Sequence, residues 1–394
     1  MRRLAFLYGF ALPFTSVLAM SGWLNLPSLL SMVILFAFLL KGGYGLKPFD
    51  VIVFATFVLP AFFSALANFH YALEEKFFSH LISYIFVFLA FYFVPRELLQ
   101  MHAAPLLKGV VAGLVFSIIF AFAEFAVGLT FGYEPLSYIP RYAVNEYDAV
   151  FSGVLRVRSL VEESGHYALY LGVVTPIAII FMMERWPKAI SVTLIAAAFF
   201  AMILTFSTSG IAFLIASALV SILSLRVSVA KKIIQIAGLV VFFVVIYFIV
   251  LVFFNIDLEN IITDKIDGMN GRQGPFEESW AYFQSGGILQ IFFGLGPGYY
   301  AYRDLEPVIS LLALMVFQSG IFGFILYIAM FIAAFKRVRV FGYKQRYLLM
   351  FSLLFAFLVY AGISNYWYPW LWFLLSVLSV GPFAFTSSLP KPQS

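Results

Sequence analysis

The sequence contains no cysteine. This absence excludes disulfide bonds, thiolate metal ligands and cysteine nucleophiles together. The chain also has only four histidines, so few imidazoles are present to bind a metal or transfer a proton.

Charged residues are scarce. They make up 11% of the 394 residues, whereas ordinary soluble domains contain about 25%. Hydrophobic residues make up 63%, and the mean hydropathy is +1.00. These values exclude an ordinary soluble domain and indicate a polytopic membrane protein. The 49 Phe and 22 Tyr fit a lipid-facing surface with aromatic residues at both interfaces.

Motifs for nucleotide-driven or metal-dependent chemistry are missing too. The chain has no Walker sequence, no G-x-G-x-x-G after a strand, no H-E-x-x-H and no G-x-S-x-G. The GLGPG at 294–298 has the wrong spacing for a dinucleotide site and predicts a turn before a helix. Ionisable residues are almost absent from the apolar runs, which argues against an ion-coupled transporter.

Apolar runs dominate what is present. A transmembrane helix needs about 17 to 25 residues, and eleven to thirteen such runs can be drawn. We therefore predict an all-α polytopic integral membrane protein, a single membrane domain over 1–394 with about twelve transmembrane helices. The twelve runs lie at 4–20, 24–40, 49–66, 77–94, 106–128, 166–183, 188–206, 210–225, 232–254, 307–335, 346–362 and 368–386.

The distribution of the 24 Lys and Arg residues predicts the orientation. With a cytoplasmic N-terminus, most of them fall in short inner loops, as the positive-inside rule requires. Both termini are then cytoplasmic, and two long polar loops, 129–165 and 255–306, are external. The net charge of +5 is thus a sign of topology and does not indicate a nucleic-acid partner.

The external loop 255–306 contains a predicted short amphipathic helix. Phe276, Trp280 and Phe283 share one helical face, and Pro275 suits the first turn. We expect this helix to lie on the outer leaflet, to break at Gly286–Gly287 and to hold Arg272 above the headgroups. Arginine there is suited to bidentate bonds with phosphate.

The external loop 129–165 leads into the sixth run. Arg156 and Arg158 precede Glu162, Glu163 and His166. One interpretation is that Glu163 or Ser164 caps the helix. The other is that the arginines hold a phosphate-bearing substrate while a carboxylate or imidazole deprotonates an acceptor hydroxyl. We expect the two external loops to meet over the membrane and form the working site.

Three other features have simpler interpretations. Gly109, Gly113 and Ser117 form a stripe of small residues that predicts close helix packing. Glu124 is either a functional group or an interfacial residue in water, and the sequence leaves both open. The NYWYPWLW stretch at 365–372 predicts an outer aromatic belt.

Four motifs occur in a fixed order over about residues 150 to 335. Together they resemble the O-antigen polymerase and O-antigen ligase family of bacterial envelope glycosyltransferases. They are Arg158 followed by Glu163-Ser164-Gly165, the turn Thr205–Gly210, Arg272 with Trp280 and Gly294-Leu295-Gly296, and Gly320-Ile321-Phe322-Gly323.

The resemblance implies a GT-C-like fold in a bacterial inner membrane. It implies transfer of oligosaccharide repeat units from polyprenyl (undecaprenyl) pyrophosphate on the periplasmic face, in O-antigen (lipopolysaccharide), capsule or exopolysaccharide synthesis. It implies no cofactor and no metal. The partners would be the lipid-linked oligosaccharide, the bilayer, and a flippase and chain-length regulator of the same pathway. Ligases of the family carry a His-Asn pair where this chain has 306–310, EPVIS, so the resemblance favours a polymerase.

The resemblance also suggests roles for individual residues. Arg158 and Arg272 would clamp the pyrophosphate, with Arg156 and Arg303 in support and with Trp280 and Glu306 as further substrate contacts. The general base stays open among Glu163, His166, Asp304 and Glu306. Two alternatives are an O-antigen ligase and a lipid-linked oligosaccharide flippase or exporter, and the exporter predicts a polar cavity through the midplane. A third is a non-catalytic component of the assembly machinery.

Overall fold

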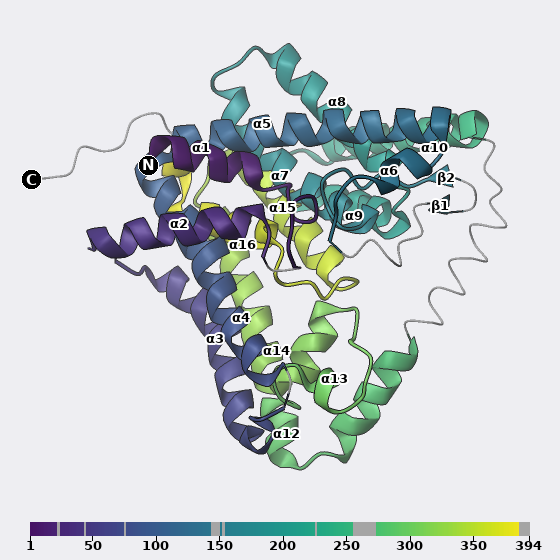
Figure 1. Ribbon diagram of the computed structural model, residues 1–394. Coiled ribbons are helices and arrows are strands. Elements are labelled where there is room, and N and C mark those ends of the chain that lie inside the picture. Colours follow the sequence, from purple (N-terminus) through teal and green to yellow (C-terminus); the bar gives the residue numbers. More distant parts are fainter. Residues whose placement is uncertain are drawn as a thin grey trace, which may run out of the picture.

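The computed structural model describes residues 1–21, 24–42, 45–74, 76–142, 150–151, 154–224, 227–254 and 273–385 (Figure 1). Its regular structure is almost entirely helical, as predicted. A small antiparallel pair, β1 (Val150–Phe151) and β2 (Val154–Leu155), lies in the loop 129–165.

Every predicted apolar run contains a helix. The longer helices are α1 (Arg2–Ala11), α2 (Leu26–Lys41), α3 (Pro48–Ala67), α4 (Phe77–Val87), α5 (Val94–Phe131), α7 (Ser164–Met183), α8 (Lys188–Leu204), α9 (Thr208–Ser224), α10 (Val229–Phe254), α14 (Leu311–Val338), α15 (Tyr343–Tyr360) and α16 (Pro369–Val380). The short elements are α6 (Glu134–Ser137), α12 (Ile288–Phe293), α13 (Tyr299–Tyr302), η1 (Phe69–Tyr71), η2 (Phe88–Phe93) and η3 (Pro382–Ala384).

Four helical stretches in the described part of the chain are long and apolar enough to cross a membrane. They are Pro48–Ala67, Phe77–Phe131, Ser164–Met183 and Leu311–Val338. Shorter apolar helices accompany them, including Lys188–Leu204, Thr208–Ser224 and Pro369–Val380. The protein is therefore a helical membrane protein by the length and composition of these segments.

The first helix is shorter than the predicted run 4–20. It ends at Ala11, and Pro13 follows, which has no backbone N–H to continue the helical bonding. The backbone N–H groups of Ser16 and Val17 instead donate to the Leu160 carbonyl at 3.2 and 3.3 Å. The segment after α1 thus folds against the loop 129–165.

The helical stretch from Phe77 to Phe131 is continuous along the chain, but a kink divides it into two helices. His102 has non-helical backbone angles (φ −144°, ψ 42°), and Pro105 lies just beyond it. This kink confirms the break predicted between the runs 77–94 and 106–128. In Figure 1, α4 runs steeply through the molecule, whereas α5 crosses its upper part with α1 beside it.

The contact between α1 and α5 depends on glycine. A methyl group added to Gly109 would overlap with the Phe6 carbonyl oxygen, and one on Gly9 would overlap with the Leu106 carbonyl oxygen. Gly113 lies equally close to the Phe10 backbone. The predicted small-residue stripe is therefore confirmed as a close helix contact.

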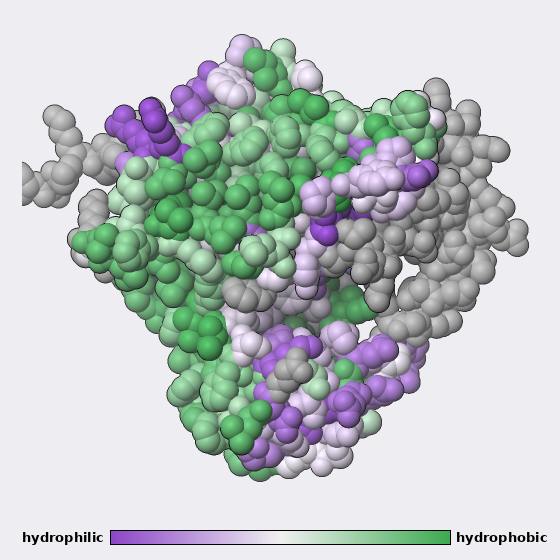
Figure 2. Space-filling view, viewed as in Figure 1, coloured by the Kyte–Doolittle hydropathy of each residue, from purple (hydrophilic) through white to green (hydrophobic). Residues whose placement is uncertain are grey.

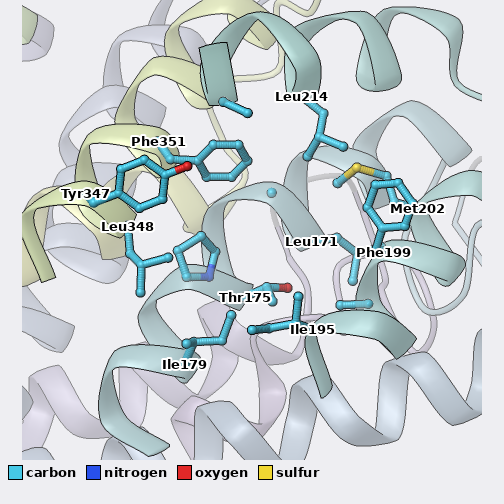
Figure 3. A pocket seen from close by; sticks show the side chains of 14 residues that line it. Leu171, Thr175, Ile179, Ile195, Phe199, Met202, Leu214, Tyr347, Leu348 and Phe351 are labelled. Carbon is cyan, nitrogen blue, oxygen red and sulfur yellow. The ribbon is translucent and has the colours of Figure 1, made fainter. Parts of the chain in front are cut away.

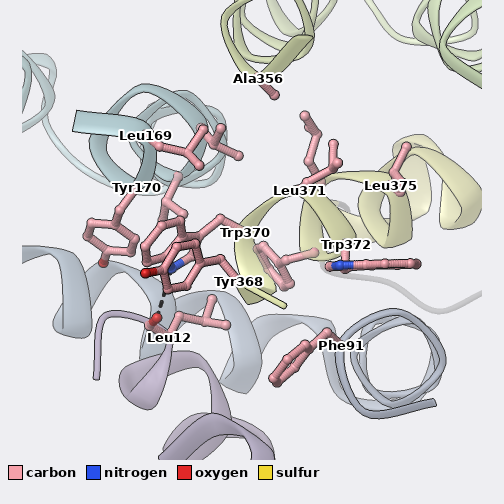
Figure 4. Close-up of a cluster of buried hydrophobic side chains, with 14 of the residues drawn as sticks. Leu12, Phe91, Leu169, Tyr170, Ala356, Tyr368, Trp370, Leu371, Trp372 and Leu375 are labelled. Atoms are coloured by element: carbon pink, nitrogen blue, oxygen red, sulfur yellow. Dashed lines mark hydrogen bonds between the residues drawn. The ribbon is translucent and has the colours of Figure 1, made fainter. Parts of the chain in front are cut away.

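Helices α7 and α16 form the centre of the molecule, and every residue of α16 is buried. Figure 4 shows Trp370 and Trp372 packed among side chains of neighbouring helices. Their indole N–H groups donate to the carbonyls of Leu12 at 2.9 Å and Tyr366 at 2.6 Å. The predicted outer aromatic belt at 365–372 is therefore wrong, because these rings have polar partners inside the protein.

Buried charges join three of the helices. Arg96 forms an ion pair with Asp50 at 2.9 Å and another with Glu97, and Ser379 donates to Asp50. All three charged side chains are buried. Asp50 of α3 therefore links Arg96 of α5 with Ser379 near the end of α16.

Helix α14 is broken at Gly320, whose φ of +68° lies outside the helical region. The break leaves carbonyl groups without helical partners, and neighbouring segments supply donors. Leu295 N–H donates to the Phe317 carbonyl at 2.7 Å, and the Ser64 hydroxyl donates to the Gln318 carbonyl. These bonds hold α12 and the GLGPG turn against α3 and α14, which fixes part of the loop 255–306.

Candidate functional site

Glu124 anchors the loop 129–165. Its side chain is 4% exposed and accepts from Arg141 at 3.0 Å. It also accepts from the backbone N–H groups of Arg158 at 3.1 Å and Ser159 at 2.6 Å. Ser159 has a φ of +53°, so the carboxylate holds the loop at a sharp turn. The sequence left open whether Glu124 is a functional group or an interfacial residue in water. Neither role fits fully, because Glu124 is buried and holds the loop in place.

The two arginines of this loop differ in accessibility. The Arg158 side chain is 2% exposed, and its Nη2 donates to the Tyr133 hydroxyl at 2.8 Å. Arg156 is half-buried, and its Nε donates to the Thr205 carbonyl at 3.4 Å. A ligand outside the protein would therefore reach Arg156 more readily than Arg158.

The start of α7 carries three of the predicted residues. Glu163 occupies the N-cap position and is exposed, but its side chain makes no capping hydrogen bond. The Ser164 hydroxyl is buried and has no hydrogen-bond partner among the described residues. Neither side chain therefore caps α7 in the manner that one interpretation proposed.

His166 belongs to a polar cluster that we name the Tyr368 cluster: Glu162, His166, Asn365 and Tyr368. The Tyr368 hydroxyl donates to the Glu162 carboxylate and lies 2.8 Å from His166 Nδ1. The Asn365 amide nitrogen lies 3.3 Å from the Tyr368 hydroxyl and 3.4 Å from His166 Nε2. One assignment satisfies all four contacts, with a neutral His166 that donates through Nδ1 and accepts at Nε2.

Glu162 and Asn365 are the half-buried members of the Tyr368 cluster, and Glu162 is the one that carries a carboxylate. His166 and Tyr368 are 5% and 1% exposed, whereas Glu162 is only half-buried. An acceptor hydroxyl could therefore approach the Glu162 carboxylate, while Tyr368 and His166 hold that carboxylate from behind. The sequence analysis named His166 but did not select Glu162, Asn365 or Tyr368. The polar pair Ser364–Asn365 at the start of an aromatic stretch was the available signal.

The predicted amphipathic helix in the loop 255–306 is present over 273–285, and Gly286 follows its last residue. Trp280 stacks on Phe276 and Phe283, with ring centroids 6.2 and 6.0 Å apart. All three rings also contact Phe317 of α14. The aromatic face therefore packs partly on α14 and is partly exposed at the surface, where Trp280 is 40% exposed.

Arg303 lies among tyrosine rings. Its guanidinium carbon is 4.9 Å from the ring centroid of Tyr71, 5.6 Å from that of Tyr282 and 5.9 Å from that of Tyr302. These distances fit cation–π attraction. Its Nε and Nη2 are buried without a hydrogen-bond partner among the described residues. Glu306 and Asp304 are exposed beside it, and Arg272 lies outside the described residues.

The connection between α15 and α16 lies between the two loops. Tyr366 stacks on Tyr84 with ring centroids 4.3 Å apart, and its hydroxyl is 2.7 Å from the Ser83 hydroxyl. One turn earlier on α4, His80 Nε2 is 2.9 Å from the Tyr300 hydroxyl. Burial raises the pKa of Tyr300 to about 12, so this phenol is neutral at physiological pH.

Polar contacts thus lead from the Tyr368 cluster through 365–368 and α4 to Tyr300. Figure 2 shows hydrophilic residues gathered in the lower part of the molecule, around α13. The described members of the two loops form two clusters, around Glu124 and around Arg303, and this connection links them. The expected meeting of the loops falls partly on 143–149, 152–153 and 255–272, which lie outside the described residues, and it stays a prediction.

No family model matches the chain, and no curated protein matches it. The function is accordingly argued from the residues described above.

Proposed function

We propose that the protein is a membrane glycosyltransferase that polymerises lipid-linked oligosaccharide repeat units. Its donor would be a glycan on polyprenyl pyrophosphate at the external face of the bacterial plasma membrane. The observation that carries the proposal is the Tyr368 cluster, in which a half-buried carboxylate is fixed by a buried phenol and imidazole. Two arginines, Arg156 and Arg158, precede it in the same segment.

The chemistry requires a base and a cation. The oxygen of an acceptor hydroxyl forms a bond with the anomeric carbon of the donor, and the bond from that carbon to the pyrophosphate oxygen breaks. The pyrophosphate leaves with the electron pair, and Glu162 takes the proton of the hydroxyl. No nucleotide is needed, because the donor is already activated.

Tyr368 and His166 act as positioning residues in this proposal. The Tyr368 hydroxyl donates to Glu162 and orients its carboxylate, and His166 donates to the same phenol oxygen. This assignment differs from the sequence-based one, in which Glu163, His166, Asp304 and Glu306 were the candidate bases. His166 is too buried to meet a sugar hydroxyl, and the Glu163 side chain makes no capping hydrogen bond that would fix it.

Arg156 is our preferred protein contact for the leaving pyrophosphate, with Arg272 and Arg303 as contacts from the external loop 255–306. We assign Arg158 the structural role of holding the loop, because its side chain already contacts Glu124 and Tyr133. Preorganised cations that meet developing charge typically contribute a factor of about 10² to 10³ in rate.

The topology belongs to the same proposal. We propose that twelve helices cross the membrane in a GT-C-like arrangement, with both termini cytoplasmic and both long loops external. The helices α1 and α16 are short for a span, and each would cross with the non-helical segments that adjoin it.

Glu162→Gln tests the assignment of the base. With purified protein and a lipid-linked repeat unit, we expect release of polyprenyl pyrophosphate to fall by a factor of about 10² to 10⁴. Glu134→Gln, at an exposed position in the same loop, is the control and should keep full activity. Full activity in Glu162→Gln with loss in Glu163→Gln would move the base to the exposed neighbour. A single transfer in place of a polymer ladder would identify a ligase.

A further inference from the structure

Two adjoining cavities lie along α7, at the opposite end from the Tyr368 cluster. The inner cavity, of about 220 Å³, lies between α7, α8, α9 and α15. The outer cavity, of about 690 Å³, lies between the same helices and α10. Both are lined by Ile179, Ile195, Tyr347 and Leu348. The two cavities therefore adjoin across these shared side chains, and we name them together the α7 groove.

The inner part of the α7 groove is apolar. Figure 3 shows Leu171, Met202, Leu214 and Phe351 around it, with Thr175 at its floor. None of its lining residues is charged. The groove follows α7 from Leu171 to Met183, a rise of about 18 Å along the helix. This length and lining suit a hydrocarbon chain.

The outer end of the α7 groove is polar. Gln235, Tyr343 and Lys344 line it, and Lys344 is exposed. The neighbouring helix ends are basic, since Arg185 follows α7 and Arg339 follows α14. Glu184 also lies at this end, but its carboxylate already forms an ion pair with Arg185 at 3.7 Å and accepts a hydrogen bond from Gln345. The charge at the mouth of the groove therefore favours an anion.

We propose that the α7 groove binds one anionic membrane lipid, with an acyl chain in the inner cavity and the headgroup phosphate at Lys344. A chain already in the bilayer gains no hydrophobic transfer energy, so the inner cavity contributes through packing. The preference for an anionic lipid comes from the lysine at the membrane surface. This site is separate from the proposed glycosyl transfer and does not depend on it.

Native mass spectrometry of the full-length protein in mild detergent tests the site. Phosphatidylglycerol and phosphatidylcholine with identical chains are titrated in parallel. The wild type should bind phosphatidylglycerol more tightly. Lys344→Gln should weaken phosphatidylglycerol binding about fivefold and leave phosphatidylcholine unchanged. Lys336→Gln is the charge-matched control, because Lys336 is exposed and lines neither cavity.

A second pair of variants tests the inner cavity. Leu214→Trp should fill it and reduce binding of both lipids, because the chain no longer fits. Val220→Trp lies on the same helix but is 47% exposed and outside the groove, so it should bind like wild type. Equal binding of both lipids by wild type, or equal binding by the two tryptophan variants, would overturn the proposal. Lys344 is exposed, so its variant remains informative if Leu214→Trp does not fold.

Discussion

At the scale of the residue, Glu124 determines the shape of the loop 129–165. One carboxylate accepts hydrogen bonds from Arg141 and from two backbone N–H groups, and Arg158 lies 4.0 Å away. Removing a buried charge of this kind leaves its partners uncompensated, which typically costs about 3 to 5 kcal/mol.

Glu124→Ala should therefore lower the free energy of unfolding in detergent by about 3 to 5 kcal/mol. Glu134→Ala, an exposed carboxylate of the same loop, should change it by less than about 0.5 kcal/mol. Thermal unfolding of the two purified variants compares them directly. Similar stability in both would show that Glu124 does not hold the loop.

The sequence indicated which segment contains this candidate site, but it did not indicate all of the residues that form the site. Arg156, Arg158 and His166 were selected because charged residues and histidines are rare in this chain and several stand together in the loop 129–165. Glu162 was not separated from Glu163, because neighbouring residues look equivalent until a partner distinguishes them. That partner, Tyr368, lies 206 residues away from Glu162 in the chain, and no local pattern reports such a distance.

At the scale of the element, glycine decides how closely helices approach. The α1–α5 contact and the α12–α14 contact both place a glycine against backbone atoms of the other helix. The first was predictable, because Gly109 and Gly113 share a face at helical spacing. The second was not, since Gly294 and Gly320 meet only because α14 is broken there.

Gly109→Ala should destabilise the protein by about 1 to 3 kcal/mol, because the added methyl group overlaps with the Phe6 backbone and forces α1 away from α5. Gly238→Ala in α10 is the matched control. A methyl group there has open space around it, so helix propensity should leave the stability equal or slightly higher. Equal losses in the two variants would contradict the close contact of α1 and α5.

Helix limits were the part of the fold that the sequence predicted least well. Hydropathy placed the apolar runs correctly, because burial in protein and burial in lipid select the same residues. For that reason it did not distinguish the lipid-facing helices from α16, which is buried on all sides. It also extended the first run through Pro13 into a segment that bonds to Leu160.

At the scale of the whole molecule, the proposed topology places Glu134 outside and Lys336 inside. The chain has no cysteine, so single-cysteine variants need no background removal. In spheroplasts, a membrane-impermeant maleimide should label Glu134→Cys directly and Lys336→Cys only after the membrane is opened. Both positions are exposed in the structure. Labelling of Lys336→Cys in sealed spheroplasts would reverse the orientation and remove the external site.

The glycosyl transfer is the central claim, and one measurement tests it most directly. Purified wild-type protein in lipid nanodiscs is given a polyprenyl pyrophosphate-linked repeat unit without nucleotide, and both products are followed. The account predicts release of polyprenyl pyrophosphate together with lipid-linked glycans of increasing length. Intact donor after long incubation with folded protein, while cells carrying the same protein make polymer, would contradict it and favour an exporter or an assembly component.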